Sequence, residues 1–225
     1  MTEAAPERIA ARASDIYDPD CTRCPRLASL LKEVRRQYPG YWARPVPPFG
    51  ASDPAILIVG LAPGMHGANR TGRPFTGDYA GILLYRTLFE LGLATRPVSA
   101  SADDGLELIH TRITNAVKCV PPENKPLPDE IRRCNTYLHA EARLLTSVRV
   151  YVALGRIAHE ALLMALDLKR SAYPFAHGRE HSLGDGSRVL IDSYHCSRYN
   201  TQTGRLTPAM FRNVMARAVE LALPA

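Results

Sequence analysis

Long apolar runs and a secretory leader are both missing from this sequence. No stretch reaches the roughly 18 apolar residues that a bilayer-spanning helix requires. Residues 1–8 also lack the basic segment and the apolar segment of a secretory signal. The chain has no internal repeat and no low-complexity segment. These absences exclude a membrane protein and predict a cytoplasmic one.

The composition fits a single folded domain over residues 1–225. Hydrophobic residues make up 46% of the chain and charged residues 22%, which allows a sizeable core. The net charge is +6 and the pI is near 9.2, which alone is weak evidence for a nucleic-acid partner. Basic residues gather in or beside two loops that matter below: Arg70, Arg73, Lys118, Arg198 and Arg205. A basic rim suits phosphate recognition, and scattered solubilising charge is the alternative.

Apolar spacing predicts strands that alternate with helices. The predicted strands lie near 55–60, 111–117, 149–154 and 189–192. The predicted helices cover about 26–38, 78–91, 129–147, 155–168 and 208–222, and the glycine-rich stretch 174–188 is expected to be a hairpin or loop. This alternation predicts one three-layer α/β/α domain with a central, mostly parallel sheet.

Two loops that follow predicted strands carry most of the polar and glycine residues. The first runs through Gly60-Leu61-Ala62-Pro63-Gly64-Met65-His66-Gly67 and on to Asp78. The second runs from Ser193-Tyr194-His195-Cys196 to Thr207. Ligands bind at the carboxyl ends of strands in open α/β sheets. Glycine, small polar groups and arginine suit the approach of phosphates and a planar ring, so both loops are candidate site loops.

Four of the five cysteines are spaced like ligands of a metal centre. They form one close pair, Cys21 and Cys24, and two separated singles, Cys119 and Cys134. Disulfides are rare in cytoplasmic proteins, so metal or redox roles come first. The spacing favours a [4Fe–4S] cluster, with structural zinc, a redox-active pair and unrelated buried thiols as alternatives. Cys196 is expected to be a small buried hydrophobe.

Taken together, these segments resemble the uracil-DNA glycosylase superfamily, and its family 5 (type b) in particular. The opening Gly-Leu-Ala-Pro-Gly, the run His-Gly-Ala-Asn-Arg-Thr-Gly-Arg and the ending Phe-Thr-Gly-Asp resemble the first motif of that family. The second motif is similar to His195-x-Ser197-x-x-Asn200-Thr201-x-Thr203-Gly204-Arg205-Leu206-Thr207. Cys21, Cys24, Cys119 and Cys134 match the family's cluster ligands in order, and the resemblance covers residues 21–212.

The sequence departs from the family pattern at one position and from a related family at another. The second motif usually has proline after its histidine, and this chain has Cys196. Family 4 usually has glutamate at the second position of the first motif, and here that position is Leu61. The chain therefore lacks a carboxylate at the place where relatives position water. The nearest polar candidates are Asn69 and Asp78, and Asp78 could equally be the N-cap of the next helix.

The resemblance implies roles for individual residues. Phe75 would stack on a base flipped out of DNA, Asn115 would read the pyrimidine edge, and His195 would stabilise the departing base. Each also has an ordinary structural reading, as a core aromatic, a satisfied buried amide or a structural histidine. Ala62 and Gly64 would line the base pocket, and Asn69 would join His195 and Asn115 as a catalytic residue without a strong general base.

The second loop would insert into DNA, with Arg198 or Tyr199 as the wedge. The residues expected to contact DNA are Arg70, Arg73, Arg198, Tyr199, Asn200 and Arg205. Arg205 could instead be a structural anchor. The small Ala62 predicts tolerance for hypoxanthine, xanthine or ethenocytosine besides uracil. Neither motif contains lysine, so a Schiff base with the sugar is not expected, although Lys118 is near.

These observations predict a monofunctional glycosylase that removes uracil and leaves an abasic site. The expected partner is damaged, double-stranded, uracil-containing DNA, bound by a monomer in a prokaryotic cytoplasm at the nucleoid. The main alternative is a non-catalytic iron–sulfur module that binds nucleic acid or carries electrons. A third is a hydrolase with Cys196 and His195 as nucleophile and base, although neighbouring residues of an extended segment point to opposite faces.

Overall fold

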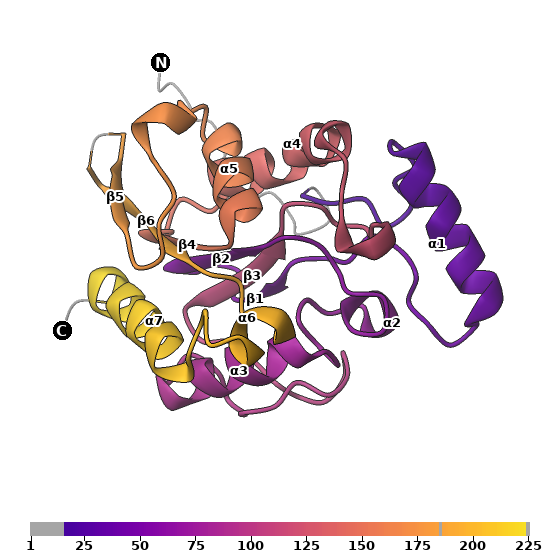
Figure 1. The fold of residues 1–225 in the computed structure, drawn as a ribbon, viewed down its shortest axis with the longest axis horizontal. Coiled ribbons are helices and arrows are strands. Elements are labelled where there is room, and N and C mark those ends of the chain that lie inside the picture. Colours follow the sequence, from indigo (N-terminus) through magenta and orange to yellow (C-terminus); the bar gives the residue numbers. More distant parts are fainter. Residues whose placement is uncertain (1–15, 185, 224–225) are drawn as a thin grey trace, which may run out of the picture.

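A six-stranded sheet forms the centre of the computed structural model, which describes residues 16–184 and 186–223 (Figure 1). The strands are β1 (Phe49–Gly50), β2 (Ile56–Gly60), β3 (Thr111–Asn115), β4 (Val150–Leu154), β5 (Glu180–Leu183) and β6 (Arg188–Ser193). Their order across the sheet is β1-β3-β2-β4-β6-β5. The four inner strands are parallel, and β1 and β5 pair antiparallel at the edges. The expected mostly parallel sheet is confirmed.

Five of the helices lie where the apolar spacing predicts them. The helices are α1 (Pro25–Gln37), α2 (Ala68–Thr71), α3 (Tyr79–Glu90), α4 (Pro128–Leu144), α5 (Arg156–Ala165), α6 (Arg198–Gln202) and α7 (Pro208–Ala222). Two 3₁₀ turns cover Pro122–Asn124 and Arg170–Ala172. The sequence analysis missed α2 and α6, because a helix of four or five residues inside a loop shows no apolar period.

The inner strands are buried on both faces, which suits the apolar runs of β2 and β4, whereas β3 is equally buried although most of its side chains are polar. Alternate residues of β2 point to opposite sides: Ile56 and Ile58 pack against α3 and α7, whereas Leu57 and Val59 pack toward α4 and α5. The same alternation holds in β4. Figure 1 shows the resulting three layers, with α3 and α7 on one face of the sheet and α4 and α5 on the other.

A smaller apolar cluster attaches α1 to one end of the domain. Leu27 and Leu31 of α1 pack against Val117, Val120 and the first turns of α4. Pro25 begins this helix, where its missing N–H and fixed φ cost little. In Figure 1 the helix lies beside the sheet rather than over either face. The predicted helix over residues 26–38 is therefore confirmed, and it brings the cysteines that precede it near the segment after β3.

The remaining elements match the expectations in part. The stretch 174–188 contains β5, which forms an antiparallel hairpin with β6.

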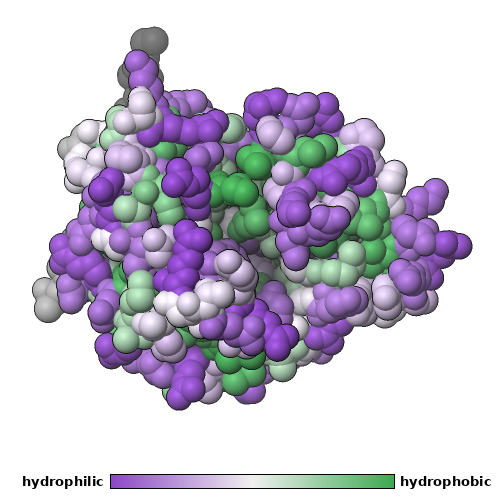
Figure 2. All heavy atoms as spheres, viewed as in Figure 1, coloured by the Kyte–Doolittle hydropathy of each residue, from purple (hydrophilic) through white to green (hydrophobic). Residues whose placement is uncertain are grey.

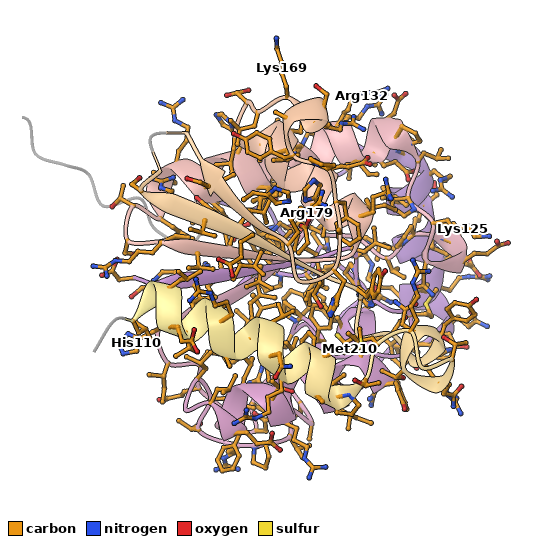
Figure 3. The ribbon with its side chains drawn as sticks, turned by 60° about the vertical axis from the view of Figure 1, so that its left-hand side comes forward. His110, Lys125, Arg132, Lys169, Arg179 and Met210 are labelled. Atoms are coloured by element: carbon orange, nitrogen blue, oxygen red, sulfur yellow. The ribbon has the colours of Figure 1, made fainter. Side chains whose placement is uncertain are left out.

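Charged side chains such as Lys125, Arg132 and Lys169 project outward around the ribbon (Figure 3). Figure 2 shows a mainly hydrophilic face with apolar side chains around a central hollow. No helix in the described ranges is long and apolar enough to cross a membrane. The prediction about residues 1–8 lies outside those ranges.

Candidate functional site

One cavity opens where β2, β3 and β6 end and where α3 and α6 begin. Both loops singled out in the sequence contribute to its walls. The lining residues are Leu61, Ala62, Gly64, Ala68, Phe75, Asp78, Tyr79, Ala80, Asn115, Asn124, His195, Ser197 and Arg198. The parallel strands place their carboxyl ends at one edge of the sheet, so residues far apart in the sequence meet there. The structure thus brings together the predicted base-binding residues, which are Ala62, Gly64, Phe75, Asn115 and His195.

Phe75 and His195 form one wall of the cavity. Their ring centroids lie 5.8 Å apart with an interplanar angle of 30°. Phe75 is buried and has a φ of 54°, a conformation that non-glycine residues rarely adopt. Pro74, the residue before it, is fixed by the Tyr85 hydroxyl, which donates to its carbonyl at 2.7 Å. The unusual backbone turns the aromatic ring toward His195 and the end of the sheet.

Gly60 leaves the room that Phe75 and Asn115 occupy. It is the last residue of β2 and pairs with Asn115, the last residue of β3. A Cβ on Gly60 would lie 2.6 Å from Cζ of Phe75 and would also collide with Oδ1 of Asn115. That oxygen is buried and has no hydrogen-bond partner in the described chain. A buried acceptor without a partner is costly, so this amide is suited to a ligand that brings a donor into the cavity.

His195 follows β6 and presents a free imidazole to the cavity. In residues 16–184 and 186–223, no hydrogen bond to either ring nitrogen is found, while the amide of Asn200 donates to the His195 carbonyl at 2.8 Å. Burial lowers the pKa of His195 to about 4, so the ring is neutral near pH 7. Asn200 therefore holds the backbone of this residue, and its side chain remains available to a bound molecule.

Asp78 is the acidic side chain of the cavity, and its role is double. Its Oδ1 accepts from the Gly81 amide at 2.9 Å and caps α3, which confirms the N-cap interpretation. Its Oδ2 points toward the glycine loop, 3.5 Å from the place of a Cβ on Gly64. Burial raises the pKa of this carboxyl, although amide hydrogen bonds from Gly81 and Ala80 lower it. No other carboxylate in the described part of the chain lines the cavity.

Asn69 does not reach the cavity. Its side chain is fully buried behind the glycine loop, where Nδ2 donates to the carbonyl of Met65 at 3.4 Å. Its backbone amide donates to the carbonyl of Gly64 at 3.1 Å. The predicted catalytic residue therefore supports the loop from below. The sequence could not predict the burial of Asn69, because nothing in it distinguishes the buried side of a one-turn helix from the exposed side.

Two cations expected at a DNA-facing rim are buried in ion pairs instead, which corrects their assignment. The guanidinium of Arg73 binds Asp104 at 2.7 Å and the carbonyl of Ala102 at 2.6 Å. The ammonium of Lys118 binds the Glu141 carboxylate at 2.9 Å, with a side chain only 2% exposed. Each acid lies more than twenty residues away in sequence, so local patterns could not reveal the pairing. Neither cation can meet a phosphate in this arrangement.

Of the other predicted DNA contacts, Asn200 is part-buried with its amide bonded to the His195 carbonyl, whereas the remaining ones are accessible. Arg70 is exposed, and its Nε donates to the His66 carbonyl at 2.7 Å. Tyr199 on α6 is 71% exposed, and the neighbouring Arg198 lies at the cavity mouth. Arg205 is exposed and places its guanidinium 4.5 Å from the ring centre of Tyr194. Arg205 therefore packs on an aromatic ring while its guanidinium stays exposed to solvent.

The sequence analysis missed several residues of the cavity wall. Tyr79, Ser197 and Asn124 line it together with the predicted residues. Tyr79 and Ser197 adjoin predicted site residues, so their position could have been inferred from proximity. Asn124 comes from the 3₁₀ turn and lies outside both motifs. No sequence signal identifies that residue, because only the fold carries the turn to the cavity.

The four predicted ligand cysteines line one separate cavity beside α1. The backbone amide of Lys118 donates to Sγ of Cys134 at 3.2 Å, and Nε of Arg23 donates to Sγ of Cys21 at 3.4 Å. Burial, then the neighbouring thiols, raises the pKa of Cys119. No three cysteine sulfurs lie within 4.8 Å of one another. Four thiols on one cavity form a donor set of the kind that binds thiophilic metals.

Cys196 lies outside that cavity and is fully buried. Burial, with a contribution from the charge of Asp78, raises the pKa of its thiol. A buried, protonated thiol is a poor nucleophile. This environment agrees with the expectation of a small buried hydrophobe and argues against a Cys196–His195 nucleophilic pair.

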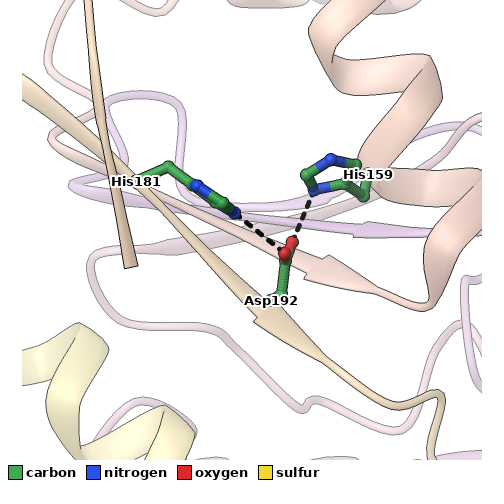
Figure 4. A group of neighbouring side chains, drawn as sticks. All are labelled: His159, His181 and Asp192. Carbon is green, nitrogen blue, oxygen red and sulfur yellow. Dashed lines mark hydrogen bonds and ion pairs between the residues drawn. The ribbon is translucent and has the colours of Figure 1, made fainter. Parts of the chain in front are cut away.

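A second polar cluster lies behind β6, where His159 and His181 face Asp192 (Figure 4). Nε2 of His159 donates to the Tyr173 carbonyl at 2.8 Å, and Nδ1 lies 2.6 Å from Oδ1 of Asp192. Nε2 of His181 donates to Oδ2 at 3.0 Å. A tetrahedral metal with bonds of about 2.0–2.2 Å holds its ligand atoms about 3.4 Å apart, so an N and an O only 2.6 Å apart form a hydrogen bond instead. His159 and Asp192 are therefore hydrogen-bonded directly to each other, and Asp192 lies three residues before His195.

Known proteins similar to this chain are uracil-DNA glycosylases. A type-5 uracil-DNA glycosylase of Thermus thermophilus is 54% identical over 207 residues, 90% of this chain and 94% of the relative. That of Pyrobaculum aerophilum is 44% identical over 88% of each chain. A type-4 enzyme of Archaeoglobus fulgidus is 34% identical over 67% of this chain and 69% of its own. The family model of the uracil DNA glycosylase superfamily matches residues 47–218, and the chain belongs to that superfamily.

Proposed function

We propose that this protein hydrolyses the N-glycosidic bond of uracil in double-stranded DNA and leaves an abasic site. The observation that carries the proposal is the convergence of Phe75, Asn115 and His195 on one cavity at the carboxyl ends of the strands. A stacking ring, an amide without a partner and a free imidazole are the groups needed to hold a flipped pyrimidine and help it leave. Membership of the superfamily supports the same reaction.

Binding and bond cleavage use different groups of the cavity. The Phe75 ring stacks on the flipped base, and the partnerless Oδ1 of Asn115 accepts from the imide N–H of uracil. His195, neutral because burial lowers its pKa to about 4, donates one ring N–H to the base oxygen O2. That oxygen becomes negative as the bond breaks, so the donor stabilises the transition state more than the bound substrate.

Asp78 supplies the carboxylate that the first motif of this chain lacks. Its Oδ2 points toward the glycine loop and is not needed for the α3 cap, which uses Oδ1. A carboxylate there stabilises the cationic sugar and orients the attacking water. No lysine of the described chain lines the cavity, and Lys118 is held by Glu141, so attack by water fits better than a Schiff base. This supports a monofunctional enzyme.

The pocket also suits larger deaminated bases. Leu61 and Ala62 line it without a polar group that would reject a purine edge. Phe75 stacks equally well on any flat ring, because stacking is tolerant of base identity. We therefore extend the proposal to hypoxanthine, with xanthine and ethenocytosine as further candidates. Action as a monomer in the cytoplasm is part of the same proposal.

We infer that the cysteine cavity holds a [4Fe–4S] cluster. Its ligands would be Cys21, Cys24, Cys119 and Cys134. The donor set fits, because four thiols line one cavity and iron–sulfur clusters are held by cysteine thiolates. When bound, the cluster supplies iron–thiolate bonds that tie the segment before α1 to the chain after β3. Arg23 and the Lys118 amide donate hydrogen bonds to the sulfurs and balance their negative charge.

Base release from a labelled duplex tests the reaction. We expect the wild-type protein to release uracil opposite guanine and, more slowly, hypoxanthine. His195→Ala should lose about 10²–10³-fold in kcat, because one donor to the developing oxyanion is removed. Asn115→Ala should lose uracil release while keeping its fold. Failure of the folded, iron-loaded protein to release any of these bases would favour a non-catalytic binding module.

The pH dependence tests the protonation state of His195. Because burial lowers its pKa to about 4, the neutral form persists through neutrality, and kcat should stay level between about pH 6 and 8. The unfolded chain takes up the proton first as the pH falls below about 6.5, so the folded state also loses stability toward acid. A kcat that fell with rising pH across this window would show that an imidazolium acts, which contradicts the proposal.

Asp78→Asn separates the chemical role of this residue from its structural one. Asparagine caps a helix as well as aspartate, so the thermal midpoint should change little. The loss of the carboxylate should lower kcat by about 10²-fold or more, measured in single-turnover base release. Asp103→Asn, at an exposed acid away from the cavity, is the matched control. An Asp78→Asn enzyme with wild-type kcat would mean that water is positioned by another group.

Metal analysis tests the cluster independently of activity. The purified protein should contain about four iron atoms per chain and absorb visible light. Cys21→Ala should lose iron and unfold at a lower temperature, since one ligand and one cross-link are gone. Cys196→Ala is the control, because this thiol lies outside the cysteine cavity, and it should keep its iron. Stoichiometric zinc without iron in anaerobically purified protein would overturn the assignment.

A further inference from the structure

A second groove runs between α3 and α7, and α6 closes one end of it. Its lining residues are Tyr79, Ile82, Leu83, Arg86, Thr87, Glu90, Thr201, Pro208, Ala209 and Arg212. Tyr79 also lines the cavity that holds His195, so the two hollows share a wall. Figure 1 shows α3, α6 and α7 grouped on one side of the molecule. The groove therefore begins at the mouth of the site and leads away from it.

The floor of the groove exposes apolar side chains. Ile82 is 64% exposed and Tyr79 is 43% exposed, although both belong to an amphipathic helix whose other side is buried. Pro208 and Ala209 of α7 add small apolar surfaces to the opposite wall. Isolated exposed apolar residues are common, but a continuous strip inside a groove indicates a surface that another molecule covers.

Both walls of the groove carry positive charge. Arg212 of α7 is exposed and has no ion pair or hydrogen bond within the described ranges. Arg86 of α3 pairs with Glu90 at 3.2 Å, so part of its charge is balanced there. At the site end, the guanidinium of Arg198 lies 5.7 Å from the ring centre of Tyr79. Two arginines and one glutamate line the groove, and Arg198 adds a further cation where the groove meets the cavity, so the net charge is positive and fits a phosphate chain.

We propose that this groove binds the DNA backbone next to the flipped nucleotide. The inference rests on the proposed function, because the flipped base in the cavity fixes where the neighbouring phosphates begin. Tyr79 and Arg198 would guide the strand out of the cavity, and its phosphates would meet Arg212 and then Arg86. The sugars would cover the apolar floor formed by Ile82 and its neighbours. The continuity of the groove with the cavity and its charge both favour DNA over a protein partner.

The salt dependence of DNA binding tests this assignment. The probe is a duplex with one 2′-fluorinated deoxyuridine, which resists hydrolysis, and the measurement is fluorescence anisotropy over a range of salt concentrations. Arg212→Ala should weaken binding on the order of fivefold at 0.1 M salt, and it should reduce the slope of log K against log salt by about one. Arg143→Ala is the matched control, because Arg143 is an exposed arginine on α4, across the sheet.

Trimmed duplexes locate the contact. Two further duplexes are each shortened to about two base pairs on one side of the lesion. The difference in DNA affinity between wild type and Arg212→Ala should vanish when the side that lies in the groove is shortened. It should persist when the other side is shortened. On the full-length duplex, Arg212→Glu should lower the DNA affinity further than Arg212→Ala does. A salt dependence of DNA binding for Arg212→Ala with the same slope as that of the wild-type protein would overturn the inference. Uracil release by the wild-type enzyme is measured separately, so the proposed function can stand while this inference fails.

Discussion

The burial of four parallel strands on both faces leaves the carboxyl edge of the sheet as the place where polar groups can meet a ligand. Along strands β2, β3, β4 and β6 a polar side chain is buried and pairs within the protein, as Thr114 does with Glu141, whereas groups at the strand ends face the cavity. Gly60, Asn115 and His195 all lie at the carboxyl edge. The missing Cβ of Gly60 decides how closely they approach, since a methyl group there would displace both Phe75 and Asn115.

The same enclosure sets the electrostatics of the cavity. Removal from water lowers the pKa of His195 and raises those of Asp78 and Cys196, because burial always disfavours the charged form. A neutral imidazole can still donate an N–H, whereas a protonated thiol cannot attack. Burial therefore leaves the His195 imidazole able to act as a hydrogen-bond donor and makes the Cys196 thiol unreactive. It also leaves the Asn115 oxygen without a partner, which a bound base would supply.

Local pattern was enough to predict the layers of the fold, the strands before both loops and a candidate cap at Asp78. The grouping of Phe75, Asn115 and His195 in one site followed instead from the resemblance of the two motifs to the glycosylase superfamily. The wrong assignments share one cause. Arg73 and Lys118 find acids 31 and 23 residues away in the chain, and such pairings depend on the fold. Asn69 fails for a related reason, because its burial is decided by how a one-turn helix sits under the loop.

Buried polar groups hold each segment of the site from behind. Arg73 and Asp104 fix the segment before α3, and the hydrogen-bonded pair of Asp192 and His159 fixes the end of β6. Lys118, between Asn115 and the cysteine cavity, is held by Glu141. Buried ion pairs contribute little net stability, because desolvation offsets much of their attraction, yet breaking one leaves an uncompensated charge. These buried ion pairs allow one arrangement of the site segments, because any other arrangement would leave a buried charge without its partner. A site whose groups must meet a flipped base within a fraction of an ångström depends on that restriction more than on added stability.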